Sequence, residues 1–432
     1  MILEVMQVAI LGRQPEISLA ELEALFGSDK IKIINDSVAS VNTNHPLPQD
    51  MLGGTIKSAT IIKNIESADL TSTFNELQDL IISLQSEIPD GKLQFGVSIY
   101  GFEAKKDYLL KKMLGLKKAI KKIGRSVRII ENKHEELEAA QVLYNKLTGP
   151  LGIELLIIKD GANVIIAKTT AVQDIDAYSR RDFDRPFRDA FVGMLPPKLA
   201  QIMINLAVGE ESLEVGKRLD LRSEILDGDK NNIANSNIKN LNSQICVLDP
   251  FCGTGVVLQE ALLMGYSAHG SDLSEKMVDY STKNLQWLSS KYKIQNTKYK
   301  IEQADATSHS WDFSKSQGQG SKIYVVCETY LGKPLTTLPS QSELSAIMNE
   351  ANIIAKKFLE NLARKIPAGT KLCLALPAWV LGNGKFKHLQ MLDQLTDLGY
   401  NRLEFVHNKD QQLIYHRPDQ IVARELTILE KI

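Results

Sequence analysis

The stretch that decides the fold is ICVLDPFCGTGVVLQEALLMGYSAHGSD, residues 245–272. A short apolar run ends at Asp249, which predicts a buried strand of a parallel sheet. Gly253 and Gly255 then let the backbone bend tightly and a ligand approach closely. Helical spacing follows, and a second apolar segment brings Asp272 about 20 residues past the glycine turn. This order predicts an α/β domain that binds a nucleotide-like ligand.

The carboxylate of Asp249 argues against NAD as that ligand. It stands immediately before the turn, where it would repel a pyrophosphate bound at the helix N-terminus. It would attract a ligand with an ammonium and a sulfonium group, and S-adenosylmethionine carries both. Asp272 would accept a hydrogen bond from the ribose of that ligand. An ordinary strand–turn–helix with incidental glycines is the alternative.

Composition sets the broader class. A chain of 432 residues is long enough for two or three domains, and its net charge of -1 excludes a polycation. The four cysteines have no CxxC spacing and lie in or beside apolar runs, which predicts buried reduced thiols. The seven histidines form no ligand pattern, so no metal site is expected. Without a signal peptide or a long apolar run, we expect a cytoplasmic protein outside the membrane.

The most basic stretch of the chain runs from Lys105 to Arg128. Its apolar residues fall on one face of a predicted helix, lysines crowd the rest, and Asp107 is the only acid. Like charges at this density destabilise a helix unless something anionic shares the face. We therefore predict contact with a nucleic-acid backbone, and a plain solvated helix is the alternative. The expected contacts are Lys105, Lys106, Lys111, Lys112, Lys117, Lys118, Lys121, Lys122 and Arg125.

Further arginines follow in a linker between this basic region and the predicted α/β domain. Arg181 and Arg185 are expected to join the nucleic-acid contacts. Pairing of the linker arginines with Asp182, Asp184 and Asp189 is the alternative.

Two segments resemble a known family. The string DPFCGTG at 249–255 is similar to motif I of the THUMP-domain RNA methyltransferases, notably the tRNA guanosine-N2 methyltransferases. The run RPFRDAFVGMLPPKLAQIMINLA at 185–207 resembles the segment that opens their catalytic domain. The resemblance implies a Rossmann-like class I methyltransferase domain with a mostly parallel seven-stranded sheet. The implied order is an N-terminal ferredoxin-like α+β domain at 1–65, a THUMP-like RNA-binding domain at 66–175, a linker at 176–192 and the methyltransferase domain at 193–432.

The same resemblance, together with motif I, indicates where S-adenosylmethionine binds. An acid after the third strand accepts from the adenine amino group in this class, which places Asp305 at the adenine. The expected cofactor contacts are Asp249, Pro250, Phe251, Cys252, Gly253, Thr254, Gly255, Asp272, Asp305, Ala306, Leu195 and Pro196.

The reacting end departs from the family. Amine methyltransferases carry Asp/Asn-Pro-Pro-Tyr/Phe after the fourth strand, whereas this chain has ETYLG at 328–332. Glu328 keeps an acceptor oxygen on a longer side chain, Thr329 keeps a carbonyl, and Tyr330 brings the aromatic ring one position early. We expect these three to be the catalytic residues that orient the amine. Since the proton can leave after methyl transfer, Glu328→Gln is expected to retain activity.

The function implied is N2-methylation of a guanosine in tRNA, with the THUMP-like module gripping the RNA. One alternative is an inactive RNA-binding protein that retains the fold, because of the altered ETYLG loop. Another is a methyltransferase for rRNA or another nucleobase amine. We expect a monomer, and the sequence does not imply an activator subunit.

Overall fold

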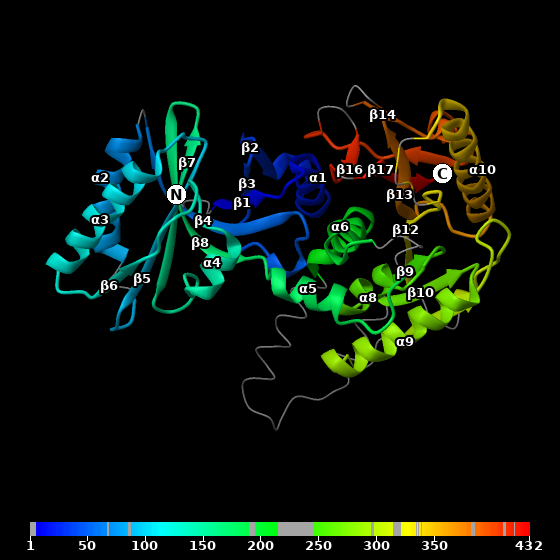
Figure 1. The fold of residues 1–432 in the computed structure, drawn as a ribbon, viewed down its shortest axis with the longest axis horizontal. Helices are drawn as coiled ribbons and strands as arrows, with labels where there is room; N and C mark the ends of the chain where they lie inside the picture. The colour runs from blue at the N-terminus through cyan, green and yellow to red at the C-terminus, as the bar shows by residue number, and fades with distance from the viewer. Residues whose placement is uncertain are drawn as a thin grey trace. The chain divides into compact units, whose positions relative to one another are not determined.

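The computed structural model describes residues 6–66, 69–84, 88–189, 195–214, 245–294, 298–313, 321–333, 335, 337, 339–381, 385–408, 412–418 and 420–432. The chain forms two compact units. The first comprises Met1–Leu19 and Phe26–Ala177, and the second comprises Ala20–Leu25 and Tyr178–Ile432. Figure 1 shows the elements of both.

The first unit is built on one sheet of eight strands in the order β2-β3-β1-β4-β8-β7-β5-β6. The strands are β1 (Met6–Leu11), β2 (Ile31–Asn35), β3 (Val38–Asn42), β4 (Thr55–Ile65), β5 (Leu93–Tyr100), β6 (Val127–Ile129), β7 (Gly152–Asp160) and β8 (Asn163–Val172). Strand β4 pairs antiparallel with β8 over most of its length. The ranges 1–65 and 66–175, expected as two domains, therefore contribute strands to a single sheet.

Helices α2 (Leu70–Leu84) and α3 (Lys106–Lys122) share one apolar core with strands of this sheet. The buried residues of α3 are Leu109, Met113, Leu116 and Ile120, which confirms the predicted apolar face. The shorter helix α4 (Ala139–Tyr144) begins with a capping box formed by Glu138 and Gln141.

Beside that core, the sheet buries an ion pair. Lys57 Nζ on β4 lies 2.5 Å from Glu154 Oε1 on β7, and both side chains are at most 2% exposed. The hydroxyls of Ser98 and Thr169 donate to the same carboxylate at 2.6 and 2.7 Å. Four strands are therefore linked through one buried acid.

The second unit contains a sheet in the order β11-β10-β9-β12-β13-β17-β15. Its strands are β9 (Ile245–Asp249), β10 (Ser267–Asp272), β11 (Tyr299–Gln303), β12 (Lys322–Glu328), β13 (Lys371–Val380), β15 (Tyr400–Arg402) and β17 (Val422–Lys431), with β14 (Phe386–Lys387) and β16 (Leu413–Tyr415) paired at the side. The first five are parallel, and β17 is antiparallel to its neighbours. Numbered along the chain, the parallel part has the doubly wound order 3-2-1-4-5. This confirms the expected Rossmann-like, mostly parallel α/β sheet.

Helices α8 (Val256–Leu263), α9 (Glu275–Tyr292) and α10 (Gln341–Ala363) follow the parallel strands β9, β10 and β12, as this topology requires. Helix α6 (Pro197–Val208) precedes β9. One apolar core of the unit joins α10 to residues of β12 and β13, and Figure 1 shows α10 beside those strands. Pro196 and Pro197 stand at the start of α6, where a missing N–H costs nothing in the first turn.

Two patterns in the sequence predict local structure wrongly. Ser18, with Glu21 three residues on, has the pattern of a capping box that would begin a helix. The first helix, α1, instead begins at Pro15 and ends at Phe26, so Ser18 lies inside it and is not its cap. The Ser18 hydroxyl instead donates to Gly54 O at 2.8 Å and accepts from Gly12 N at 3.2 Å. The sequence also predicts a helix after Trp379, where the described residues form only a short 3-10 helix, η5 (Gln390–Gln394).

Candidate functional site

The candidate site begins at the glycine turn that joins β9 to α8. Gly255 caps α8 with a φ of +86°, a conformation that side-chain-bearing residues rarely adopt. A Cβ at this position would lie 3.0 Å from Ser281 Cβ on α9. Gly253 also has a positive φ, of +50°. The backbone and the close approach of Ser281 therefore require glycine at 255, and the φ of Gly253 favours glycine.

Asp249 is a buried carboxylate without a cationic partner among the described residues. It is 2% exposed, and its Oδ1 accepts one hydrogen bond, from Phe251 N at 3.1 Å. Burial raises the pKa of Asp249 well above its usual range. The Phe251 N–H opposes that rise, whereas the nearby carboxylates of Asp272 and Glu328 add to it. A cation arriving here would relieve this excess of negative charge, as expected for a positively charged ligand.

Asp272 ends β10 and holds the turn. Its Oδ2 accepts from Gly253 N at 2.9 Å, and its Oδ1 accepts from Ser274 N at 2.9 Å. Burial raises the pKa of Asp272 above its ordinary value, although both backbone bonds oppose the shift. Each carboxylate oxygen keeps a further lone pair for a ligand hydroxyl. This support of the glycine turn is a role that the sequence did not predict.

The remaining residues of the turn are fixed by the surrounding backbone. Cys252 N donates to Ser271 O at 2.9 Å, and Thr254 O accepts from Asn284 Nδ2 at 2.9 Å. Pro250 O accepts a long bond from the Ser271 hydroxyl. All four cysteines are buried and free, which confirms the prediction, and burial raises the pKa of Cys252 well above its usual range.

Asp305 and Ala306 follow β11, the strand beside β10. Ala304 N donates to Asp272 O at 2.9 Å, so the loop after β11 meets the end of β10. The exposed carboxylate of Asp305 accepts from the backbone and hydroxyl of Thr307 at 2.9 and 2.7 Å. Ala306 is buried, and its carbonyl accepts from Asn361. Leu195, which is buried, and Pro196 stand immediately before α6.

The predicted catalytic residues lie at the end of β12, next to β9 in the sheet. Glu328 Oε1 accepts from Arg424 Nε at 2.5 Å. Thr329 is buried, and its N–H donates to Ala375 O at 3.1 Å. Burial and a hydrogen bond with Glu350 of α10 raise the pKa of Tyr330 above its ordinary value. Each of the three residues therefore has a contact within the fold. The sequence did not predict the contact between Glu328 and Arg424.

The lysines predicted to contact RNA lie along α3 in the first unit. Lys105, Lys106, Lys111, Lys118, Lys121 and Lys122 are exposed, and Lys112 and Lys117 are half-buried. Within the described part of the chain, none of them forms an ion pair. Arg125 is used differently, because its guanidinium donates to the carbonyls of Ile88 and Pro89.

The linker arginines have structural partners. Arg181 Nε donates to the buried carboxylate of Glu260 at 2.9 Å. Arg185 Nη2 donates to Asp182 at 3.1 Å, and its side chain is 0% exposed. Contact with RNA does not fit Arg185 in this conformation, because the side chain cannot reach solvent. Asp184 and Asp189 pair instead with lysines of α9, Lys291 and Lys276.

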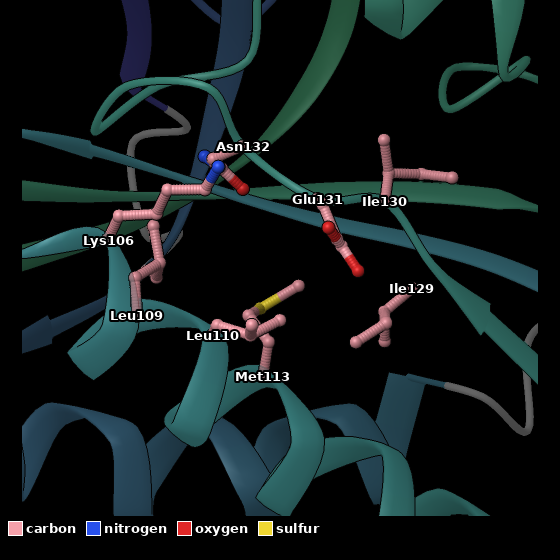
Figure 2. A pocket seen from close by; sticks show the side chains of 8 residues that line it. All are labelled: Lys106, Leu109, Leu110, Met113, Ile129, Ile130, Glu131 and Asn132. Carbon is pink, nitrogen blue, oxygen red and sulfur yellow. The ribbon is translucent and has the colours of Figure 1, made fainter.

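Hollows also occur in the first unit. Figure 2 shows a cleft between α3 and the segment that follows β6, with Leu109, Met113 and Ile129 on its apolar side. Its volume of about 20 Å³ holds about one water molecule. A broader groove of about 750 Å³ shares Ile129–Glu131 and adds Arg128, Lys133 and Tyr144. Neither hollow includes any residue of the glycine turn. The candidate ligand site is therefore identified by the buried acids at the strand ends and not by the volume of a cavity.

Over the described ranges, no helix has the length and apolarity needed to cross a membrane.

Comparison with known proteins gives one related sequence. No protein-family model matches the chain. A tRNA (guanine(10)-N2)-dimethyltransferase from Methanothermobacter thermautotrophicus is 26% identical over 217 residues, which are 50% of this chain and 48% of that protein. The chain therefore aligns with about half the length of the curated relative it matches.

Solved structures show distant likeness. The crystal structure of TrmN from Thermus thermophilus has a TM-score of 0.48 and 13% identity, over 99% of this chain and 100% of that chain. A possible methylase from Clostridium difficile 630 has a TM-score of 0.43 and 13% identity, over 98% and 97% of the two chains.

Proposed function

We propose that this protein is an S-adenosylmethionine-dependent RNA methyltransferase that methylates the exocyclic N2 of a guanosine in tRNA. The observation that carries the proposal is Asp249, a buried carboxylate with no cationic partner among the described residues, at the end of the central strand β9. A cationic methyl donor satisfies that charge, and a pyrophosphate does not. The related tRNA (guanine(10)-N2)-dimethyltransferase supports the choice of substrate.

Each proposed cofactor residue contacts a different part of the ligand. Asp249 holds the cationic end, Asp272 accepts from the ribose, and Asp305 lies at the adenine. The glycine turn gives the ligand access to the backbone, because no side chain stands there. When bound, S-adenosylmethionine supplies an electrophilic methyl group to a nucleophile held at the strand ends.

The nucleophile is the difficult part of this chemistry. The lone pair of a guanine amine is delocalised into the ring, so the enzyme must orient its N–H groups with acceptors. Glu328 supplies a carboxylate oxygen and Thr329 a carbonyl, both beside Asp249 at the ends of neighbouring strands. Tyr330 offers an aromatic ring against which a flipped base can stack.

The first unit supplies the RNA interface of this proposal. The exposed lysines of α3 form no ion pairs among the described residues, so phosphates can neutralise them. The adjoining groove adds Arg128, Lys133 and Tyr144, and the residue Tyr144 is 84% exposed. An exposed aromatic ring beside basic residues suits an unpaired base.

The experiment that tests the proposal is methyl transfer to bulk tRNA from radiolabelled donor, followed by digestion to nucleosides and chromatography. We expect label in N2-methylated guanosine. Asp249→Ala is the control, because it removes the carboxylate proposed to hold the donor. Label in rRNA but not in tRNA would favour the rRNA alternative. Binding of tRNA without any methyl transfer would favour an inactive RNA-binding protein that retains the fold. The altered ETYLG loop is the reason for considering that alternative.

A further inference from the structure

Arg424 and Glu328 meet across three strands of the second sheet. Glu328 ends β12 beside Ala375 of β13, and Arg424 on β17 stands opposite Pro377 of the same β13. Ala375 and Pro377 are two residues apart, so their partners point to the same face of the sheet. The two side chains are 12% and 7% exposed, and the pair is therefore nearly dry.

The guanidinium engages one oxygen of the carboxylate. Arg424 Nε donates to Glu328 Oε1, and within the described residues no other hydrogen bond reaches the Glu328 side chain. The second oxygen, Oε2, keeps its lone pairs. A buried guanidinium that loses its partner is strongly unfavourable. Arg424 will therefore donate a hydrogen bond to any acceptor oxygen on the side chain of residue 328.

We propose that Arg424 is a positioning residue that fixes Oε1 of Glu328 and thereby turns Oε2 toward the substrate amine. The inference rests on the proposed function. It explains how a glutamate can serve where the family has a shorter side chain, because the ion pair fixes the additional rotatable bond. The ion pair also makes the two neighbouring acids different: Arg424 compensates the charge of Glu328, while Asp249 stays available to a cation.

This arrangement reverses the expectation for Glu328→Gln. An amide has one acceptor oxygen, and Arg424 will take it. The NH2 group of the glutamine then faces the substrate amine, so that two donors meet. Glu328→Gln should therefore be nearly inactive, although the sequence alone suggests that it retains activity. Removal of Arg424 frees the amide to turn its oxygen toward the amine.

The test compares initial rates of methyl transfer to bulk tRNA for four proteins: wild type, Glu328→Gln, Glu328→Gln/Arg424→Met and Glu328→Gln/Arg402→Met. We expect kcat of Glu328→Gln to fall about 100-fold, the loss typical of one misplaced hydrogen-bonding group. Adding Arg424→Met to Glu328→Gln should raise kcat about 10-fold above that of Glu328→Gln alone. Arg402→Met is the matched control, because Arg402 pairs with Glu425, whose side chain points to the other face of β17.

A second readout does not depend on turnover. Glutamine lacks the carboxylate charge but still accepts a hydrogen bond from Arg424, whereas alanine leaves the guanidinium without a partner, so Glu328→Ala should melt several degrees below Glu328→Gln. Both variants should bind S-adenosylhomocysteine as wild type does in calorimetry, because neither change touches Asp249 or Asp272.

The outcomes separate the inference from the proposed function. A wild-type chain that transfers no methyl group refutes the proposed function, and equal melting of Glu328→Gln and Glu328→Ala refutes the Arg424 contact independently. A fully active Glu328→Gln enzyme overturns the inference even if the double variant fails to fold. A double variant as slow as Glu328→Gln also overturns it and indicates that the carboxylate takes the proton.

Discussion

The carboxylate of Asp272 accepts a hydrogen bond from the backbone nitrogen of Gly253 at 2.9 Å, so the acid at the end of β10 holds the turn at the end of β9. A second backbone N–H, from Ser274, occupies its other oxygen. The residue proposed to bind ribose is therefore also the residue that shapes the glycine turn.

Asp272→Asn should weaken the binding of S-adenosylmethionine about 10- to 100-fold. Asparagine has one acceptor oxygen, so one of the two backbone N–H groups loses its partner, and a bond to a charged group contributes roughly 1.5–3 kcal/mol. Calorimetry with S-adenosylhomocysteine measures the change. Asp279→Asn is the control, because Asp279 pairs with Lys283 on the exposed side of α9. Equal affinities for the two variants would contradict the role of Asp272.

Binding of the cationic ligand should strengthen as pH rises. In the free protein the pKa of Asp249 is raised by burial, and a bound cation favours the ionised form and lowers that pKa. Binding then releases a proton below the raised pKa, and affinity increases by up to about tenfold per pH unit until pH exceeds it. Calorimetry across the neutral range, in buffers with different ionisation enthalpies, measures both effects. Asp249→Asn should bind more weakly and with less dependence on pH; an unchanged pH profile would argue against Asp249.

Reversal of two charges on α3 should weaken tRNA binding. Lys111→Glu/Lys118→Glu places acids on the exposed face, where we expect phosphates. The slope of log affinity against log salt should fall by about 2, because each lost phosphate contact contributes about 0.9. Filter binding over a salt series measures it. Lys30→Glu/Lys32→Glu makes the same change in charge near β2, at the opposite edge of the sheet from β6, and should matter less.

Breaking the buried pair of Lys57 and Glu154 should destabilise the fold strongly, whereas replacing both residues by apolar ones should destabilise it much less. Lys57→Met leaves the Glu154 carboxylate buried without its cation, and such a change destabilises by about 3–5 kcal/mol. Lys57→Met/Glu154→Met should lose much less, because an apolar pair needs no compensation. Urea unfolding compares them. Lys63→Met breaks an exposed pair with Glu76 and should change stability by less than about 1 kcal/mol. A double variant less stable than Lys57→Met would contradict this.

Features coded by neighbouring residues could be predicted from the sequence. The strand, turn and helix at 245–263 depend on local apolar spacing and two glycines, and the structure forms them as expected. The apolar face of α3 is equally local. The capping pattern at Ser18 does not predict the start of α1, because the Ser18 hydroxyl bonds to Gly54, 36 residues away.

Contacts set by the order of strands could not be predicted. Glu328 and Arg424 are 96 residues apart in sequence and meet because β13 lies between β12 and β17. The burial of Arg185 likewise depends on packing, whereas its neighbours in the sequence suggested an exposed basic linker. Charge alone does not distinguish an arginine that reaches solvent from one that stabilises a helix.

The single sheet of the first unit limits how the chain can be shortened. A protein that starts after residue 65 would lose β4, which pairs with β8 and carries Lys57. The freed edge of β8 would expose unpaired backbone groups, and Glu154 would remain without its cation. A fragment that keeps this sheet whole should therefore run from the start of the chain to about residue 177, whereas a protein trimmed at 65 should aggregate.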